Sequence, residues 1–158
     1  MTATRPEFSL RALEARDVPG FTALLSDEVS RHWSSTGLGN ALASEHQFRV
    51  LALPGVSGEE ELAGIAEYQR IVDEGHLLGI AIVPAMRQRG LGRKLLIAVM
   101  AEMRAEGCVR CLLEVRRSNK AGQALYERLG FKPDGVRRAY YPPLAGYAAE
   151  DAMLYSCP

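Results

Sequence analysis

A basic, glycine-containing stretch in the middle of the chain has the composition of an anion-binding site. Its residues follow the spacing Arg87-x-x-Gly90-x-Gly92, with Arg89 inside the stretch and Arg93 directly after it. Glycines lack a Cβ atom, so a ligand can approach the backbone closely. The apolar spacing that follows predicts a helix, whose N-terminus presents N–H groups and a positive dipole end. These features indicate a site for a multiply charged anion, typically a pyrophosphate; a solvated strand-to-helix turn is the alternative.

Two other phosphate-binding motifs are missing from the sequence. No segment matches G-x-x-x-x-G-K-[ST], and no G-x-G-x-x-G follows a strand near the N-terminus. The first absence disfavours a P-loop, and the second disfavours a Rossmann dinucleotide site.

Glu114 is a carboxylate near the end of a predicted apolar strand. Leu113 precedes it and Val115 follows it. Carboxylates are rarely buried unless they are paired. Glu114 is therefore a candidate general base, and the alternative is that it pairs with a nearby arginine.

Tyr126 and Asn119 lie seven residues apart on the next predicted segment. In a helix this separation is two turns, which puts both side chains on one face, toward one elongated ligand. A phenol with a pKa of about 10 can give its proton to a departing thiolate with a pKa of about 8.5. The alternative is a core tyrosine on the side of Leu125 and Leu129.

The elements that must position these residues can be read from periodicity and turn signals. Asp17 is a candidate N-cap of a first helix, with Pro19 in its first turn. A second helix is expected over 91–106 and ends at Gly107. Ser118 or Asn119 is the candidate N-cap of a third helix. An irregular segment is expected over 30–40 and a loop over 140–143. The predicted strands are 8–13, 47–53, 62–72, 76–83, 109–115, 131–136 and 151–156. Early strands followed by alternating helices and strands predict an α/β (α+β) mixed sheet with helices on both faces.

Length and composition restrict the function classes. The chain has 158 residues, 47% hydrophobic and 24% charged, with a net charge of zero, which predicts one domain over 1–158 and disfavours general nucleic-acid binding. No apolar run reaches membrane length, and Met1–Glu7 does not resemble a signal peptide. Three cysteines, an odd number without a disulfide framework, suit a reducing cytoplasm. The three histidines are scattered along the sequence. The single C-x-x-C of Cys108 and Cys111 has no second pair, so we expect no metal.

The same motifs resemble those of a known family. Arg87-x-x-Gly90-x-Gly92 resembles the pyrophosphate loop of the GNAT acetyltransferases. The later part is similar to the bacterial ribosomal-protein-alanine N-acetyltransferases, densely from about Leu78 to Met153. The matching runs are Leu113-Glu114-Val115-Arg116-x-Ser118-Asn119, Ala124-Leu125-Tyr126-Glu127-x-Leu129-Gly130-Phe131 and Arg137-Arg138-x-Tyr140-Tyr141-Pro142.

The resemblance implies the GNAT fold, a splayed mixed sheet flanked by helices, with acetyl-CoA as cosubstrate and no metal. It implies that Glu114 accepts a proton and that Tyr126 donates one. It also implies a set of residues that bind the coenzyme. These are Ile80, Ala81 and Ile82 for the pantetheine arm and acetyl carbonyl, Gln88, Arg89, Gly90, Leu91, Gly92 and Arg93 for the pyrophosphate, and Asn119 for the pantetheine region.

The resemblance further implies a protein N-terminus as acceptor, the N-terminal alanine of ribosomal protein bS18, for a cytoplasmic monomer or weak oligomer. Trp33, Tyr140 and Tyr141 are candidates for lining the peptide groove. Acidic residues could attract a basic tail; they are Glu45, Glu59, Glu60, Glu61, Asp73, Glu150 and Asp151. Two alternatives stay open: an acetyltransferase for a small-molecule amine or a lysine side chain, and a non-catalytic acyl-CoA-binding module.

Overall fold

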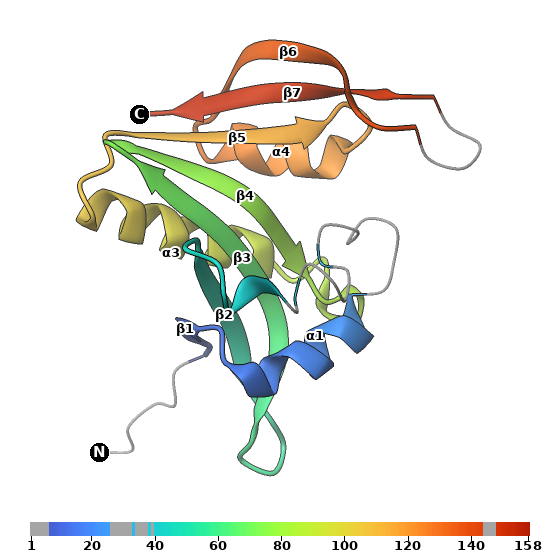
Figure 1. Cartoon of the computed structure of the whole chain (residues 1–158). Helices are drawn as coiled ribbons and strands as arrows, with labels where there is room; N and C mark the ends of the chain where they lie inside the picture. The colour runs from blue at the N-terminus through green and yellow to red at the C-terminus, as the bar shows by residue number, and fades with distance from the viewer. Residues whose placement is uncertain (1–6, 26–32, 34–37, 39, 144–147) are drawn as a thin grey trace. The chain divides into compact units, whose positions relative to one another are not determined.

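The chain forms a mixed β-sheet with helices, in a computed structural model that describes residues 7–25, 33, 38, 40–143 and 148–158 (Figure 1). The strands hydrogen-bond in the order β1-β2-β3-β4-β5-β7-β6. The elements are β1 (Ser9–Ala12), the 3-10 turn η1 (Ala15–Asp17), α1 (Val18–Leu24), β2 (Gln47–Pro54), β3 (Glu60–Ile71), β4 (Glu74–Ile82), η3 (Pro84–Met86), α3 (Leu91–Ala105), β5 (Arg110–Arg116), α4 (Lys120–Arg128), β6 (Lys132–Tyr141) and β7 (Glu150–Cys157).

Both kinds of strand pairing occur, which confirms the predicted mixed sheet. β4 and β5 pair in parallel from Glu74–Arg110 to Leu77–Leu113. The ladders β1–β2, β2–β3, β5–β7 and β6–β7 are antiparallel. No helix in the described part of the chain is both long and apolar enough to span a membrane.

The structure divides into two compact units. The first comprises Met1–Tyr68 and Gly79–Val99, and the second comprises Gln69–Leu78 and Met100–Pro158. A single domain over residues 1–158 therefore stays a prediction.

The first unit has an apolar core beneath α1. As predicted, α1 begins after Asp17 and carries Pro19 in its first turn. Phe21 of this helix is fully buried, whereas Leu24 is 41% exposed. The core cluster consists of Phe21, Leu25, Trp33, Leu38, Val50, Ala52, Ile65 and Val83. Trp33, a candidate for the peptide groove, is thus a core residue; most of the predicted irregular segment 30–40 lies outside the described residues.

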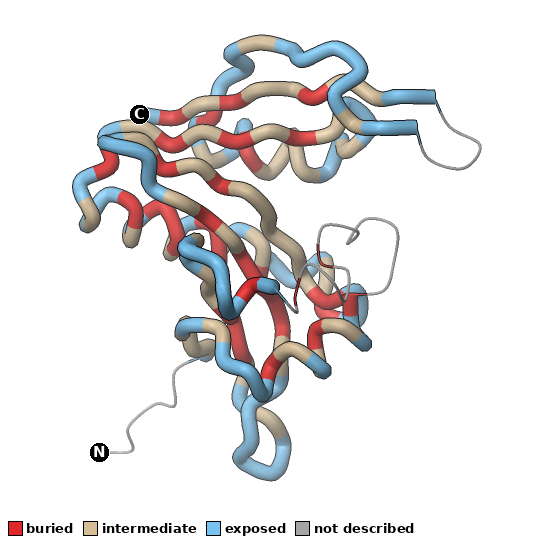
Figure 2. The backbone as a smooth tube through the Cα atoms, in the orientation of Figure 1, coloured by how far each residue is buried: buried red, intermediate tan, exposed pale blue. Residues whose placement is uncertain are grey.

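In the second unit, burial alternates along β5 (Figure 2). Cys111, Leu113 and Val115 are buried, whereas Glu114 between the last two is half-buried. Side chains alternate across a strand, so Glu114 points to the opposite face from its apolar neighbours. The preceding helix α3 ends as predicted before Gly107, whose φ of 93° lies in the left-handed region.

The predicted loop at Tyr140 and Tyr141 is wrong, because both residues belong to β6. The β6–β7 register shifts between Arg137, opposite Ala152, and Tyr141, opposite Glu150. A bulge of this kind adds residues to one strand without ending the pairing. The strand therefore continues to Tyr141 and stops only before the two prolines.

Candidate active site

The predicted pyrophosphate loop lies in the first unit, between η3 and α3. Gln88 and Gly90 have positive φ values of 64° and 74°, on either side of Arg89. All three residues are exposed. A Cβ atom built on Gly90 would meet no heavy atom within 4 Å, so the backbone is open to a ligand at this point.

The N-terminus of α3 follows directly. The Lys94 N–H donates to the Gly90 carbonyl over 3.2 Å, the first bond of the helical pattern. The N–H groups of Leu91, Gly92 and Arg93 precede that bond and have no acceptor one turn earlier in the helix. Leu91 is buried and anchors the helix start. The arrangement can bind an anion through N–H groups and the helix dipole.

The four cations of this stretch differ in what they contact. Arg89 and Arg93 are exposed. Arg87 turns back, and its Nε donates to the Ile82 carbonyl over 2.9 Å. The Lys94 Nζ lies 2.8 Å from a Glu7 carboxylate oxygen. Arg89 and Arg93 are therefore the exposed cations of this stretch, and their contact with a phosphate group stays a prediction.

The strand predicted to contact the coenzyme is β4, where Ile80, Ala81 and Ile82 are half-buried. Sequence reasoning missed Gly64 on β3, which allows a close approach to this strand. A Cβ atom on Gly64 would lie 2.6 Å from Ile82 Cδ1 and 3.0 Å from the Ala81 carbonyl oxygen. A lone glycine within an apolar strand was the available signal, because such a residue often marks a close approach of backbones.

The predicted proton-transfer residues lie in the second unit. The Glu114 side chain is 31% exposed, and its Oε1 lies 3.3 Å from Arg137 Nε. The alternative that Glu114 pairs with an arginine is thus confirmed. A partly exposed carboxylate can still exchange protons with a ligand, so the general-base role stays a prediction.

Tyr126 is buried in α4 and only 6% exposed. Its ring lies 5.9 Å from Phe131 and 6.4 Å from Tyr155, centroid to centroid. Burial, with a smaller effect of Tyr141, raises the pKa of Tyr126 to about 12. No hydrogen bond joins its hydroxyl to another described residue. The phenol is protonated at neutral pH, as a proton donor must be, and its packing also matches the alternative of a core tyrosine.

Asn119 is the N-cap of α4, and its Oδ1 accepts the Gly122 N–H over 2.9 Å. The expected alignment of Asn119 and Tyr126 along one helix face is wrong at Asn119, because its amide turns back over the helix start. A Cβ atom on Gly122 would lie 2.7 Å from Asn119 Nδ2, so the glycine makes room for the cap. A contact of Asn119 with pantetheine stays a prediction.

The C-x-x-C segment places both of its thiols inside the fold. Cys108 and Cys111 are both buried, and Cys111 Sγ lies 3.5 Å from Met103 Sδ. Burial raises the pKa of both thiols, which disfavours the reactive thiolate. Within the described residues, no group of three or more His, Cys, Asp or Glu side chains could hold a metal ion.

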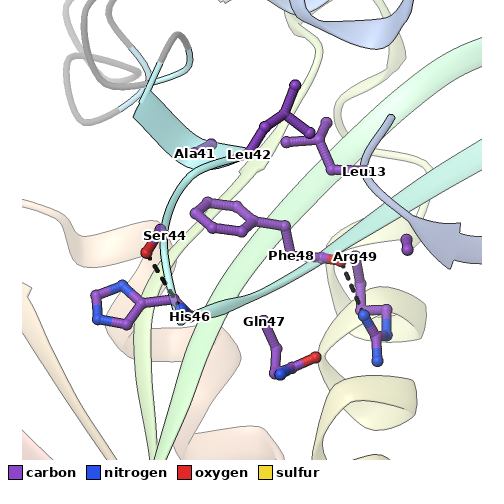
Figure 3. A pocket seen from close by; sticks show the side chains of 9 residues that line it. Leu13, Ala41, Leu42, Ser44, His46, Gln47, Phe48 and Arg49 are labelled. Carbon is purple, nitrogen blue, oxygen red and sulfur yellow. Dashed lines mark hydrogen bonds between the residues drawn. The ribbon is translucent and has the colours of Figure 1, made fainter. Parts of the chain in front are cut away.

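A pocket of about 160 Å³ lies in the first unit, away from the predicted site residues in sequence (Figure 3). The His46 N–H donates to Ser44 Oγ over 3.1 Å, and Arg49 donates to the Phe48 carbonyl over 3.0 Å. Its lining consists of Ala12, Leu13, Ala41, Leu42, Ser44, His46, Gln47, Phe48 and Arg49. None of the residues predicted for the coenzyme or for proton transfer lines this pocket.

Comparisons with known proteins agree with the predicted fold and family. A family model described as acetyltransferase (GNAT) family matches residues 11–131. The [ribosomal protein bS18]-alanine N-acetyltransferase of Salmonella typhimurium is 42% identical over 65% of this chain and 68% of its own length. The enzyme of the same name from Escherichia coli K12 is 34% identical over 95% of this chain and 97% of its own.

Solved structures give the same result. The crystal structure of the ribosomal-protein-S18-alanine N-acetyltransferase from Escherichia coli matches with a TM-score of 0.81 and 32% identity, over 96% of this chain and 93% of that one. Ard1 from Thermoplasma volcanium matches with a TM-score of 0.79 at 17% identity, over 96% and 97% of the two chains, a likeness of fold. The predicted fold class is confirmed.

Proposed function

The chain belongs to the GNAT acetyltransferase family, and we propose that it transfers the acetyl group of acetyl-CoA to the N-terminal alanine of ribosomal protein bS18. The observation that carries this acceptor is the nearly end-to-end match to the Escherichia coli enzyme of that name. Such a match includes the segments on the acceptor side as well as the coenzyme loop.

We assign acetyl-CoA binding to the loop before α3 and to β4. The residues that would bind the pyrophosphate are Gln88, Arg89, Gly90, Leu91, Gly92 and Arg93. This assignment is supported by the open backbone at Gly90, the exposed Arg89 and the N–H groups at the start of α3. Ile80, Ala81, Ile82 and Asn119 would hold the pantetheine arm and the acetyl carbonyl. When bound, the coenzyme supplies an activated thioester.

Glu114 and Tyr126 would move the protons of the reaction. The amine nitrogen forms a bond to the acetyl carbon, and the bond from that carbon to sulfur breaks. Glu114 accepts the proton that the amine loses, and Tyr126 gives a proton to the sulfur. Backbone N–H groups of β4 would offset charge on the carbonyl oxygen. An α-amine has a pKa about 2.5 units below that of lysine, so its deprotonation costs roughly 3.4 kcal/mol less. One carboxylate suits such an acceptor, and the chemistry requires no metal.

The acceptor-side predictions change in part. Tyr140 is 48% exposed and stays a candidate for contact with the peptide. Three of the acidic residues expected to attract a basic tail already pair with arginines of this chain: Glu60 with Arg11, Glu150 with Arg116 and Asp151 with Arg117. With a ribosomal protein as acceptor, we place the enzyme in the cytoplasm, as a monomer or weak oligomer.

Mass spectrometry of a bS18 N-terminal peptide incubated with acetyl-CoA and this protein tests the proposal. We expect one acetyl group on the α-amine of the alanine, with release of free CoA. A peptide with a blocked N-terminus and a free lysine, and a small polyamine, are the matched controls. Acetylation of a control in preference to the free alanine would overturn the acceptor. Binding of acetyl-CoA without transfer to any amine would favour the non-catalytic module.

A further inference from the structure

The bulge in β6 has an unusual backbone conformation at its centre. Ala139 has a φ of 50°, a left-handed value that is uncommon for a residue with a side chain. Its N–H donates to Asp151 Oδ1 over 2.8 Å, and Asp151 Oδ2 lies 3.1 Å from Arg117 Nη1. The surrounding structure therefore holds the bulge in place. A conformation of this kind costs free energy and persists where neighbouring contacts impose it, often near functional sites.

Residues of β6 near Ala139 form a stack of aromatic rings and guanidinium groups with Arg116 of β5. Arg137 lies over the ring of Tyr140, with its Cζ 5.4 Å from the ring centroid. The Tyr140 and Tyr141 rings are 5.2 Å apart, and Arg116 Cζ lies 4.1 Å above the Tyr141 ring. Planar guanidinium groups stack well on aromatic faces. The bulge thus orders the side chain of Arg137, which is 56% exposed.

We propose that Arg137 is a positioning residue for acetyl transfer, because the bulged end of β6 orients its guanidinium against the carboxylate of Glu114. This inference rests on the proposed function, in which Glu114 accepts the proton of the attacking amine. The contact of 3.3 Å between Arg137 Nε and Glu114 Oε1 is the link. The Glu114 side chain has several rotatable bonds and could adopt several orientations. Contact with the ordered Arg137 selects the one in which the free lone pairs of the Glu114 carboxylate face the acceptor.

The effect of such a contact is on turnover rather than on coenzyme affinity. A displacement of a reacting group by about 1 Å can lower the rate roughly 100-fold. Arg137 is not among the residues assigned to bind acetyl-CoA, so the KM for acetyl-CoA should change little when it is removed. We expect kcat to fall about tenfold or more in Arg137→Ala.

A double-mutant cycle with Glu114 tests the inference. Arg137→Ala and Glu114→Gln are measured singly and together, with Arg138→Ala as the matched control one residue along β6. If Arg137 acts through Glu114, then Arg137→Ala lowers kcat in the wild-type background and has little further effect in the Glu114→Gln background. Arg138→Ala should leave kcat unchanged in each background, at the wild-type value or at the lowered value of Glu114→Gln.

Chemical rescue separates positioning from a structural role. Non-denaturing concentrations of guanidinium should restore part of the kcat of Arg137→Ala and leave Arg138→Ala and Glu114→Gln unchanged. Wild-type kcat in Arg137→Ala overturns the inference. An equal loss of kcat from Arg137→Ala in the wild-type and Glu114→Gln backgrounds overturns it too. Wild-type kcat in Glu114→Gln overturns the general-base role in the proposed function instead, so the two failures are distinguishable.

Discussion

At the scale of single residues, the burial of Tyr126 has two opposite effects on the proposed proton donor. With a pKa of about 12, the phenol stays protonated far above neutral pH. The same shift makes it a weaker acid: the gap to a thiol with a pKa of about 8.5 is about 3.5 units, or roughly 5 kcal/mol. Complete transfer before the carbon–sulfur bond breaks would therefore be unfavourable. We infer that the proton moves as negative charge develops on sulfur.

Replacing Tyr126 by phenylalanine should therefore lower kcat strongly and leave acetyl-CoA affinity nearly unchanged. The ring packing is retained, whereas the transferable proton is lost, at a typical cost of about 100-fold or more. In the wild-type enzyme, a donor with a pKa of about 12 should give no descending limb in kcat near pH 10. Steady-state kinetics over an alkaline pH series measure both effects.

The matched control for this variant is Tyr155→Phe. Tyr155 is another buried tyrosine of the second unit, with its hydroxyl 2.9 Å from Glu127 Oε1. It has no assigned part in the reaction, so this variant should keep its turnover. Wild-type turnover in Tyr126→Phe would contradict the donor role. A descending limb in the wild-type kcat near pH 10 that disappears in Tyr126→Phe would contradict the raised pKa of the donor.

At the scale of elements, the close approach of β3 to β4 links packing to coenzyme binding. Gly64 provides this approach in the first unit, opposite Ala81 and Ile82. A neighbour that is the end of a flexible side chain can shift, but the Ala81 carbonyl oxygen belongs to the backbone. A side chain at position 64 must therefore displace the strand that is proposed to contact the acetyl group.

Gly64→Ala should accordingly weaken acetyl-CoA binding and lower the free energy of unfolding by about 1–3 kcal/mol, the usual range for overpacking. Isothermal titration calorimetry and thermal unfolding measure the two quantities. Gly135→Ala is the control, because a Cβ atom there would lie 3.5 Å from Leu154 Cδ1, an ordinary contact. Unchanged coenzyme affinity in Gly64→Ala would argue against a coenzyme contact at Ala81 and Ile82.

Elements with strong local signals were predicted well from the sequence. The helix expected over 91–106 is α3, and Asn119 begins α4 as one of two predicted caps. The end of β6 was missed because two tyrosines followed by two prolines are typical of a loop. Its bulge depends on a hydrogen bond from Ala139 to Asp151, twelve residues away, and local patterns do not report such contacts. The direction of the Asn119 amide was missed for a different reason: the cap was predicted, but capping uses the same side-chain atoms as the expected ligand contact.

At the scale of the whole molecule, motif spacing predicted the family, because the glycine loop and the Glu114 and Tyr126 segments occur together in one order. What the spacing could not show is which charges the chain uses for its own stability.

Asp17 was expected only as a helix cap, but it is 3% exposed and binds Arg11 through both oxygens, at 2.7 and 2.8 Å. Arg11 also pairs with Glu60 at 2.9 Å. This ion cluster joins β1, η1 and β3.

The ion cluster predicts how stability depends on pH. The hydrogen bonds from Arg11 hold the pKa of Asp17 below its usual value. A carboxyl group with a lowered pKa in the folded state stabilises the fold fully above its unfolded pKa of about 3.9, and this contribution is lost as the pH falls through the folded value. Removal of one partner of a buried pair costs about 3 kcal/mol or more.

Asp17→Asn should therefore lower the free energy of unfolding by about 3 kcal/mol at neutral pH, measured by urea denaturation. The difference from wild type should shrink in acid, because a protonated Asp17 resembles the asparagine in shape and charge. Glu14→Gln is the control: its partner Arg16 is 62% exposed, so that pair contributes about 1 kcal/mol or less. A deficit in Asp17→Asn that is the same at neutral and acidic pH would show that the side chain stabilises the fold by packing rather than by its charge.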